Sequence, residues 1–385
     1  MITQEVYAGK SLFLWYNIIM QYLAVLGRQP KLSLAELESL FSDVEPLGHT
    51  LATFTSANTP SISRLGGTIK LAQEISEKPE KYLLDLDVDG KIVFGISDYS
   101  NGVNARKTQS LALKIKRILK ANGKSVRVLE NKDAVLSSAT VFHNQLGEKP
   151  GHVEFIKFKN RWFILIGVQN INAYRDRDQG RPARDAKVGM LPPKLAQILI
   201  NLCGPLQSNS RILDPFCGTG VVLQEALLMG YSVYGTDASE RMIEYSGKNL
   251  DWLDKKSSSV VEVGDATNYK WQQSIDAVAS ETYLGPPMSE PPVEIKLKTV
   301  EQECRGIVVS FLKNLGSQIE KDTPVVIAVP AWLRPDGSYY RLRLLDELEK
   351  LGYNVVKYKS LSQRDLLYHR DGQVVAREII VLRKK

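Results

Sequence analysis

A glycine-containing loop in the second half of the chain has residue types and spacing suited to a nucleoside ligand. Residues 212–220 read Ile-Leu-Asp-Pro-Phe-Cys-Gly-Thr-Gly, which predicts a strand ending at Asp214 and a turn that opens a helix. Gly218 and Gly220 permit a tight turn and close approach of a ligand at the carboxyl edge of an open α/β sheet. Leu223 stands where a dinucleotide fingerprint has its third glycine, and the loop G-x-x-x-x-G-K-[ST] is absent from the sequence. NAD is therefore disfavoured, and no phosphate-cradling loop takes its place.

Three acids follow three successive predicted strands around this loop. Asp214 ends the first strand, Asp237 ends the second, and Asp265 follows the third. An acid at the end of the second strand suits the two hydroxyls of a ribose. The three acids together fit a cofactor with a ribose, an adenine amine and a cationic amino-acid tail but no phosphates. S-adenosyl-L-methionine (SAM) has these groups.

Each element of this pattern also has an ordinary structural explanation. Gly-x-Gly is a common turn, and Asp after a strand commonly caps a helix. The three acids and the loop in this order, each at a strand end, favour the cofactor site. The predicted cofactor-binding residues are Asp214, Pro215, Phe216, Cys217, Gly218, Thr219, Gly220, Asp237, Ala238, Asp265 and Ala266.

Basic residues concentrate in one stretch of the first half. The chain has a net charge of +7, and residues 105–132 hold nine Lys and Arg against the single acid Glu130, so the remainder is close to neutral. A helix is predicted over Gln109–Ala121, with apolar residues on one face and basic residues on the other. A solvated helix face would mix charges of both signs, whereas this one predicts a polyanionic partner. The predicted RNA-binding residues here are Arg106, Lys107, Lys114, Arg117 and Lys120.

Strands and helices alternate in the second half. Strands are expected at residues 211–213, 232–235, 260–263, 275–279, 325–329, 355–358 and 374–382, and helices at 221–229, 240–253, 300–319 and 339–351. Strands separated by helices imply parallel pairing and a doubly wound sheet. The first half is expected to be α+β, with strands at residues 22–26, 51–55, 91–96, 125–129, 153–159 and 161–168 and a helix at 63–77 as well as the basic one.

Length and composition limit the class of protein. A chain of 385 residues, 43% hydrophobic and 24% charged, should hold two or three globular domains. Three Cys and four His, with no C-x-x-C motif, exclude a disulfide framework and favour no metal site and a cytoplasmic location. The longest apolar run, Leu12 to Leu26, is interrupted by Asn17 and Gln21, so no membrane span is predicted. Met20 is a candidate start, with residues 1–19 as an extension.

The motifs taken together resemble a known family. Residues 214–220, Tyr-Gly-Thr-Asp-Ala at 234–238, Val-Gly-Asp-Ala-Thr at 263–267 and Leu-Pro-Pro-Lys-Leu-Ala at 191–196 resemble those of THUMP-domain tRNA guanine N2-methyltransferases acting on guanosine ten. Residues 22–37 are similar to the N-terminal region of that family. The resemblance implies an N-terminal ferredoxin-like α+β domain (1–99), a THUMP-like RNA-binding domain (100–172), a linker (173–193) and a Rossmann-like SAM methyltransferase domain (194–385).

The chain departs from that family after the fourth strand. Such enzymes usually carry Asp/Asn-Pro-Pro-Tyr there, where the polar side chain accepts hydrogen bonds from the target amine and the ring stacks on the extruded base. Here Glu281, Thr282 and Tyr283 occupy the slots, and we predict that they are catalytic. A second register, residues 285–288 (Gly-Pro-Pro-Met), keeps two prolines but loses the acceptor and the ring. The first register is therefore preferred.

Two further groups are candidates for chemistry. Arg175 and Arg181 lie in a charged stretch that could grip phosphates between domains, although its interleaved acids suit a salt-bridged linker equally well. Cys217 lies beside the predicted cofactor loop, but no neighbouring base is present to activate it as a nucleophile.

The sequence thus predicts a SAM-dependent RNA methyltransferase whose N-terminal half binds tRNA or another structured RNA and whose C-terminal domain methylates an exocyclic amine of guanosine. Two alternatives stay open, a DNA amino-methyltransferase and a catalytically silent SAM- and RNA-binding factor. The sequence does not specify the modified nucleotide, mono- or dimethylation, the oligomeric state or an activating protein subunit.

Overall fold

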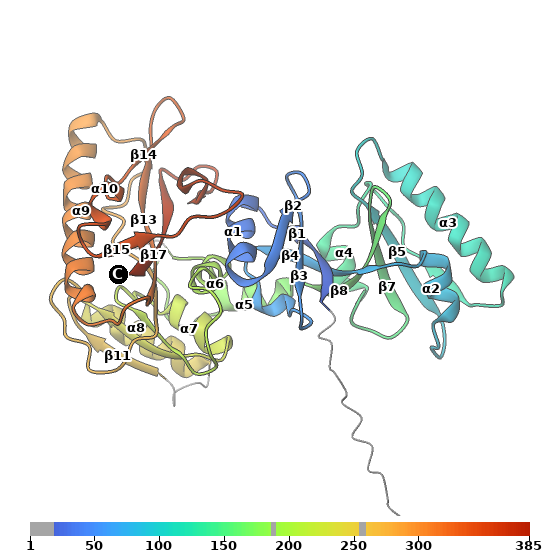
Figure 1. The fold of residues 1–385 in the computed structure, drawn as a ribbon, viewed down its shortest axis with the longest axis horizontal. Coiled ribbons are helices and arrows are strands. Elements are labelled where there is room, and N and C mark those ends of the chain that lie inside the picture. Colours follow the sequence, from blue (N-terminus) through green and yellow to red (C-terminus); the bar gives the residue numbers. More distant parts are fainter. Residues whose placement is uncertain (1–18, 186–189, 254–258) are drawn as a thin grey trace, which may run out of the picture.

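A computed structural model describes residues 19–185, 190–253 and 259–385. The expected N-terminal extension therefore lies almost wholly outside the described residues. Two mixed sheets with their helices lie side by side along the long axis of the molecule (Figure 1). The first sheet is built from residues 20–168 and the second from residues 211–384.

The N-terminal half forms one continuous sheet of eight strands. In spatial order these are β2 (Ser42–Pro46), β3 (Leu51–Ser56), β1 (Met20–Leu26), β4 (Thr68–Ile75), β8 (Arg161–Val168), β7 (His152–Phe158), β5 (Ile92–Asp98) and β6 (Val126–Val128). The remaining elements are α1 (Pro30–Leu40), η1 (Ile62–Arg64), α2 (Pro79–Asp85), α3 (Ala105–Ala121) and α4 (Ser138–His143). Strand β8 pairs with β4, so strands from both sides of the expected domain boundary at residue 99 belong to one sheet. The two-domain description of this half stays a proposal.

Helix α3 has the amphipathic character that its sequence predicts. Its buried residues are Thr108, Ala112, Ile115 and Leu119, and the last three pack in a core with β5 and β6. The helix starts at the N-cap Asn104, whose side chain accepts a hydrogen bond from the Lys107 backbone N–H at 3.0 Å. It lies at the end of the molecule farthest from the C-terminal sheet (Figure 1).

The C-terminal half has the predicted doubly wound sheet. Its order is β11 (Ser259–Val263), β10 (Ser232–Asp237), β9 (Arg211–Asp214), β12 (Ala277–Glu281), β13 (Pro324–Leu333), β17 (Val375–Lys384) and β15 (Tyr353–Val355). The first five strands are parallel, and β17 runs antiparallel to β13. Strand order reverses between β9 and β12, which is where open α/β sheets bind ligands. The helices are α6 (Pro193–Leu202), α7 (Val221–Leu228), α8 (Glu240–Trp252), α9 (Glu294–Gly316) and the short α10 (Leu345–Leu348).

Two predicted helices are wrong. Residues 63–77 form η1 and strand β4 instead, because Gly66 and Gly67 interrupt the segment and the following residues pair with β1 and β8. A Cβ at Gly67 would lie 2.7 Å from Ser33, so the close approach requires glycine. Residues 339–351 hold strand β14 (Tyr339–Arg341), paired with β13, and only one short helix. Pairing in the folded protein overrides local helix propensity in both segments.

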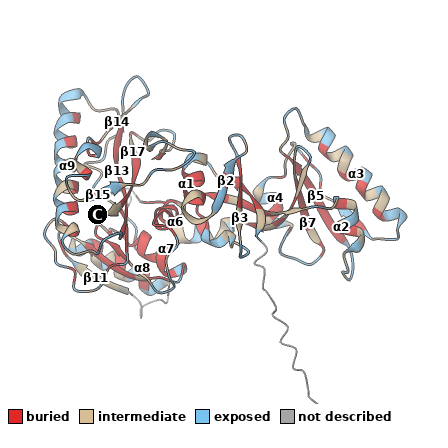
Figure 2. Ribbon diagram, viewed as in Figure 1, coloured by how far each residue is buried: buried red, intermediate tan, exposed pale blue. Residues whose placement is uncertain are grey.

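The two halves meet through helices α1 and α6, which pack together. At this contact the buried Glu36 carboxylate accepts hydrogen bonds from the backbone N–H groups of Gly66 and Gly67, both at 2.9 Å, and from the Asn201 amide at 2.7 Å. Burial raises the pKa of Glu36 to about 7, against the opposing effect of these donors. Leu32 and Ala35 of α1 belong to the same buried cluster as residues of α6, and both helices carry buried residues in Figure 2.

Candidate cofactor and catalytic site

The predicted glycine loop connects β9 to α7 at the point where the strand order reverses. Gly220 is the N-cap of α7 with φ +81°, and a Cβ there would lie 2.5 Å from Ser246 Oγ. Gly218 also has positive φ, at +50°, but a Cβ there would meet only the Phe216 carbonyl at 4.0 Å. Glycine is thus required at 220 for packing, whereas at 218 it leaves open space beside the backbone for a ligand.

Asp214 anchors the start of this loop from inside the protein. Its side chain is 2% exposed and accepts hydrogen bonds from Ser280 Oγ at 2.5 Å and from the Phe216 N–H at 3.3 Å. Burial, with a smaller effect from the charges of Asp237 and Glu281, raises the pKa of Asp214 to about 7 against the opposing hydrogen bonds. Three carboxyl groups therefore surround the loop, which favours a ligand that carries positive charge.

The second acid is fixed by the backbone. Asp237 accepts hydrogen bonds from the N–H groups of Gly218 at 3.0 Å and Ser239 at 2.9 Å, so it ties β10 to the glycine loop. Burial raises the pKa of Asp237, and these two bonds oppose the shift. Asp265 is exposed beyond β11, and its Oδ1 accepts from the N–H and hydroxyl of Thr267. The structure thus places all three predicted acids at one edge of the sheet.

The remaining predicted cofactor residues differ in accessibility. Ala238 is exposed, whereas Pro215 and Ala266 are buried. The half-buried Phe216 ring packs against Phe311 of α9 with ring centroids 5.2 Å apart. The Cys217 thiol is buried, and burial raises its pKa well above the ordinary value. A thiol held protonated is a poor nucleophile, so its position argues against nucleophilic catalysis.

Arg181 does not lie where an RNA-binding residue should. It is 3% exposed, and its guanidinium donates to Thr219 Oγ1 in the glycine loop at 3.3 Å. Its Nε has no hydrogen-bond partner in the described residues, and burial lowers its pKa. The predicted phosphate contact by Arg181 is therefore wrong, because the side chain is turned inward. Arg175 is exposed and paired with Asp176, and its contact with RNA stays a prediction.

The stretch expected to be a linker is partly ordered structure that packs on the cofactor loop. Helix α5 (Ile171–Gln179) places Arg177 against Glu225 of α7, with Nε–Oε1 at 2.6 Å. Asn249 of α8 donates from Nδ2 to the carbonyls of Ala183 and Thr219, both at 2.9 Å. Residues 186–189 of this stretch lie outside the described part of the chain. The interleaved charges thus act as the salt-bridged connection that the sequence also allowed.

The predicted catalytic segment begins at the carboxyl end of β12. Glu281 is half-buried, and its Oε1 accepts a hydrogen bond from Arg377 Nε at 2.5 Å. Thr282 is 3% exposed, and its N–H and hydroxyl both donate to the Ala328 carbonyl of β13. Tyr283 is 38% exposed and presents its ring to solvent. The side chain of Thr282 is therefore structural, whereas Glu281 and Tyr283 lie at the surface of the ligand edge.

Residues 285–288, which form the alternative register, lie farther along this loop, near α9. Gly285 has φ +84°, and a Cβ there would lie 2.7 Å from Val300 Cγ1 of α9. Residues 285–288 thus follow the loop toward α9, away from β12. Their position favours the first register, with Glu281 as the acceptor.

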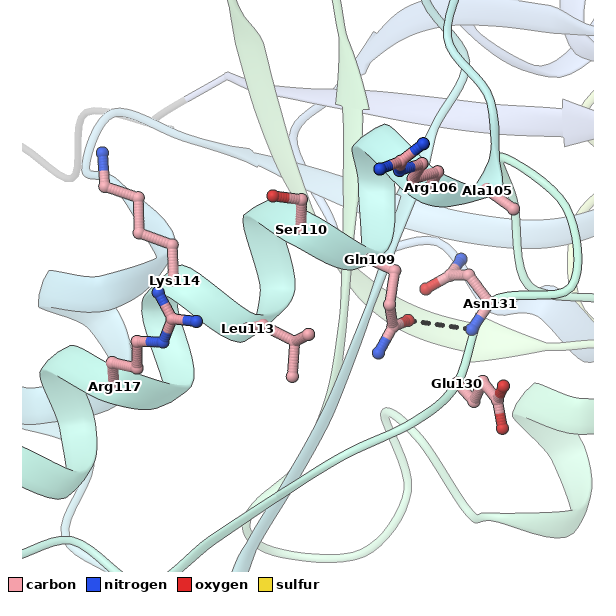
Figure 3. Close-up of a pocket in the computed structure, with 9 residues that line it drawn as sticks. All are labelled: Ala105, Arg106, Gln109, Ser110, Leu113, Lys114, Arg117, Glu130 and Asn131. Carbon is pink, nitrogen blue, oxygen red and sulfur yellow. Dashed lines mark hydrogen bonds between the residues drawn. The ribbon is translucent and has the colours of Figure 1, made fainter.

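The basic helix presents an open positive surface. Arg106, Lys107, Lys114, Arg117 and Lys120 are all exposed, and none forms an ion pair within the described ranges. A pocket of about 620 Å³ lies between α3 and the segment after β6 (Figure 3). Its lining includes Arg106, Leu113, Lys114 and Arg117. At its base Gln109 accepts a hydrogen bond from the Asn131 N–H at 2.9 Å.

Two absences hold for the part of the chain that the structure describes. None of its helices combines the length and apolar character needed to cross a membrane. In the same residues, no three His, Cys, Asp or Glu side chains gather as a metal site would need.

Comparison with known proteins agrees with this site. Residues 181–299 match the family model described as "RMKL-like, methyltransferase domain". The C-terminal half has a Rossmann-like methyltransferase fold. The match begins at Arg181, so it includes the buried arginine, the glycine loop, the three acids and Glu281.

Curated relatives match parts of the chain. A tRNA (guanine(10)-N2)-dimethyltransferase of Methanothermobacter thermautotrophicus is 32% identical over 176 residues, which cover 45% of this chain and 49% of the relative. One of Pyrococcus abyssi is 42% identical over 98 residues, which cover 25% of this chain and 29% of that protein. The chain therefore spans about half or less of the length of these relatives. TrmN of Thermus thermophilus aligns with 95% of this chain and 100% of its own, with a TM-score of 0.48 and 18% identity.

The residues at this edge fit SAM. Gly218 leaves room beside the loop, Asp237 lies at the end of β10 where a ribose would be bound, and three carboxyl groups surround the site where a sulfonium cation would lie. The Nε of the buried Arg181 has no hydrogen-bond partner among the described residues, although the charges of Asp178 and Glu225 act on the guanidinium. A carboxylate on the amino-acid tail of the cofactor would give this Nε an acceptor. Sequence reasoning missed this role because nothing local distinguishes an inward from an outward arginine.

Proposed function

We propose that the protein is a SAM-dependent tRNA methyltransferase that methylates the exocyclic amine of a guanosine and works in the cytoplasm. The observation that carries the proposal is the meeting of a cofactor loop with an acceptor and a ring, Glu281 and Tyr283, at one reversal point of the sheet. The relatives named as tRNA guanine methyltransferases support the choice of substrate.

Two glycines and two charged side chains would hold the cofactor. Gly218 and Gly220 shape the loop, Asp237 would accept the ribose hydroxyls, and Arg181 would pair with the carboxylate of the amino-acid tail. When bound, SAM supplies a methyl group on a positively charged sulfur, whose bond to carbon breaks with the electron pair remaining on sulfur.

Glu281 would activate the target nitrogen. The lone pair of an exocyclic guanine amine is delocalised into the ring, which makes the nitrogen a weak nucleophile. A carboxylate that accepts one N–H orients the amine and increases the electron density available to form the new N–C bond. The amine loses one proton as the bond forms, and the Glu281 carboxylate that accepts its hydrogen bond would take this proton. The exposed ring of Tyr283 would stack on the flipped base and fix its plane.

The N-terminal half would bind the body of the RNA. Its basic helix lies at the opposite end of the molecule from the C-terminal sheet (Figure 1), so only a large substrate can contact both. Exposed cations without ion-pair partners in the described residues suit phosphate contacts. A tRNA has both the charge and the length to contact the two ends, and a THUMP-like role for this region follows from the same proposal.

Transfer of tritium from labelled SAM to total tRNA, with double-stranded DNA in parallel, tests this function. We expect label in tRNA and none in DNA. Label in DNA alone would replace the proposal with a DNA amino-methyltransferase. SAM and tRNA binding without transfer to either would identify a silent binding factor.

A further inference from the structure

An ion pair at the catalytic edge joins two strands that are not neighbours. Arg377 of β17 donates from Nε to Glu281 Oε1 of β12 at 2.5 Å, and their side chains are 7% and 15% exposed. Oε2 of Glu281 has no hydrogen-bond partner among the residues that the structure describes. One oxygen of the carboxylate is thus tied down, while the other is left to accept a hydrogen bond.

The strand between them makes room for this contact. In the sheet β13 lies between β12 and β17, where Ala328 pairs with Glu281 on one side and Pro330 pairs with Arg377 on the other. Neighbouring strands lie about 4.8 Å apart, so the guanidinium must reach across roughly two such spacings. Because the Ala328 side chain is small, it leaves space over β13 for the Arg377 side chain to cross.

A second acid lies near Glu281. Asp214 of β9 lies close enough for the negative charge of Glu281 to act on it, and both carboxyl groups are at least partly buried. Hydrogen bonds between charged groups are short and directional, so the contact with the Arg377 guanidinium fixes Oε1 of Glu281 and with it the direction of Oε2.

We propose that Arg377 is the positioning residue of the methyl-transfer site, which holds Oε1 of Glu281 and aims its free Oε2 at the target amine. The proposal rests on the proposed function, and it deepens it by explaining how Glu replaces the shorter Asp or Asn. A Glu side chain has one more rotatable bond than Asp, and the contact with Arg377 removes that freedom.

A second ion pair on the same strand provides a matched control. Arg341 Nη1 lies 2.7 Å from Glu378 Oε1, with side chains 25% and 3% exposed, and neither residue contacts Glu281 in the described structure. Arg341→Met thus removes a comparable pair from β17 without touching the acceptor. If Arg377 only stabilises the fold, the two substitutions should have similar effects.

A double-mutant cycle on kcat at saturating SAM and tRNA tests the proposal. We expect Arg377→Met to lower kcat by about 100-fold in the otherwise wild-type enzyme. In the Glu281→Gln background it should lower kcat by less than about threefold, since its partner charge is already gone. Arg341→Met should leave kcat within about threefold of wild type. Multiplicative losses from Arg377→Met and Glu281→Gln would overturn the proposal.

A second readout does not depend on methyl transfer. In protein labelled with ¹³C at the glutamate carboxyl carbons, with Glu281→Gln identifying the signal, the Glu281 carboxyl resonance should move in Arg377→Met because Oε1 loses its donor. Arg341→Met should leave this resonance in place. Arg377→Lys keeps a charged donor, and it should move the resonance less than the loss of the donor does, which provides the test if Arg377→Met does not fold.

The two readouts separate the failure of this proposal from failure of the proposed function. No methyl transfer by the wild type to any RNA, together with a moved Glu281 carboxyl resonance in Arg377→Met, would refute the function and keep the ion pair as the contact that positions Glu281. An unchanged resonance in both Arg377 variants would overturn the inference, whatever the activity.

Discussion

The cofactor edge of the C-terminal sheet and the basic helix α3 handle charge in opposite ways. At the cofactor edge Asp214, Asp237 and Glu281 are held by hydrogen bonds or an ion pair before any ligand arrives. On α3 the cations are exposed, and within residues 19–185, 190–253 and 259–385 they have no ion-pair partners. This contrast suits the proposed roles of the two regions, which are binding of one small ligand at the cofactor edge and of a large polyanion on α3.

This difference predicts how substitutions should behave. A preorganised site depends on individual atoms, so the loss of one group has a large effect that salt changes little. A surface of exposed cations acts through counterion release, so each charge has a modest effect that salt weakens.

The largest effect should come from the acceptor. Glu281→Ala removes both the hydrogen-bond acceptor and the charge, and we expect kcat to fall by about 1,000-fold. Glu281→Gln keeps an acceptor oxygen and should lose less. SAM affinity should stay near wild type in both, which isothermal titration calorimetry would check. Methylation by Glu281→Ala at the wild-type rate would mean that the acceptor has been misplaced.

An intermediate effect should follow from the buried arginine. SAM is expected to bind with about −8 kcal/mol, a low-micromolar Kd. Arg181→Met removes the proposed partner of the cofactor carboxylate and should weaken SAM binding by about tenfold or more. The exposed Arg184, three residues along the chain, provides the control, and Arg184→Met should leave SAM affinity unchanged.

Equal SAM affinity in wild type and Arg181→Met would remove the arginine from the cofactor site. Asp237→Ala tests the other end of the cofactor in the same titration. Binding undiminished by that change would argue against SAM as the ligand of this edge.

The smallest effect per residue should come from the basic helix. Reversing Lys114, Arg117 and Lys120 to Glu should weaken tRNA binding. The plot of log affinity against log salt concentration should also become less steep by about 2, because each lost phosphate contact contributes about 0.7 to its slope. SAM affinity should not change. The same reversal at the exposed lysines 321, 350 and 357 changes net charge equally and should leave tRNA affinity nearly unaffected. Identical salt slopes for wild type and the α3 variant would show that this helix is an ordinary solvated face.

The cofactor edge and the basic helix could both be predicted in outline from the sequence, because each is marked by a local pattern of residues. Alternating strands and helices predict a parallel sheet, and the carboxyl ends of parallel strands meet at one edge. Asp214, Asp237 and Glu281 could therefore be placed together from their positions after successive strands. The basic helix followed from the periodicity of its apolar and charged residues.

What the sequence could not predict depends on contacts between distant residues. Arg377 lies 96 residues from Glu281 and reaches it only because β17 is added beside β13. Arg181 turns inward because the stretch around it packs on α7 and α8. Strand β4 replaced an expected helix because its pairing partners, β1 and β8, come from opposite ends of the N-terminal half.

The central claim is that a guanosine amine in tRNA receives the methyl group at Glu281. Mass spectrometry of nucleosides from unmodified tRNA, incubated with SAM and either wild-type protein or Glu281→Ala, tests it most directly. We predict N2-methylated guanosine with the wild type and none above background with the variant. A methyl group on another base or atom, or equal N2-methylguanosine from both proteins, would contradict the claim.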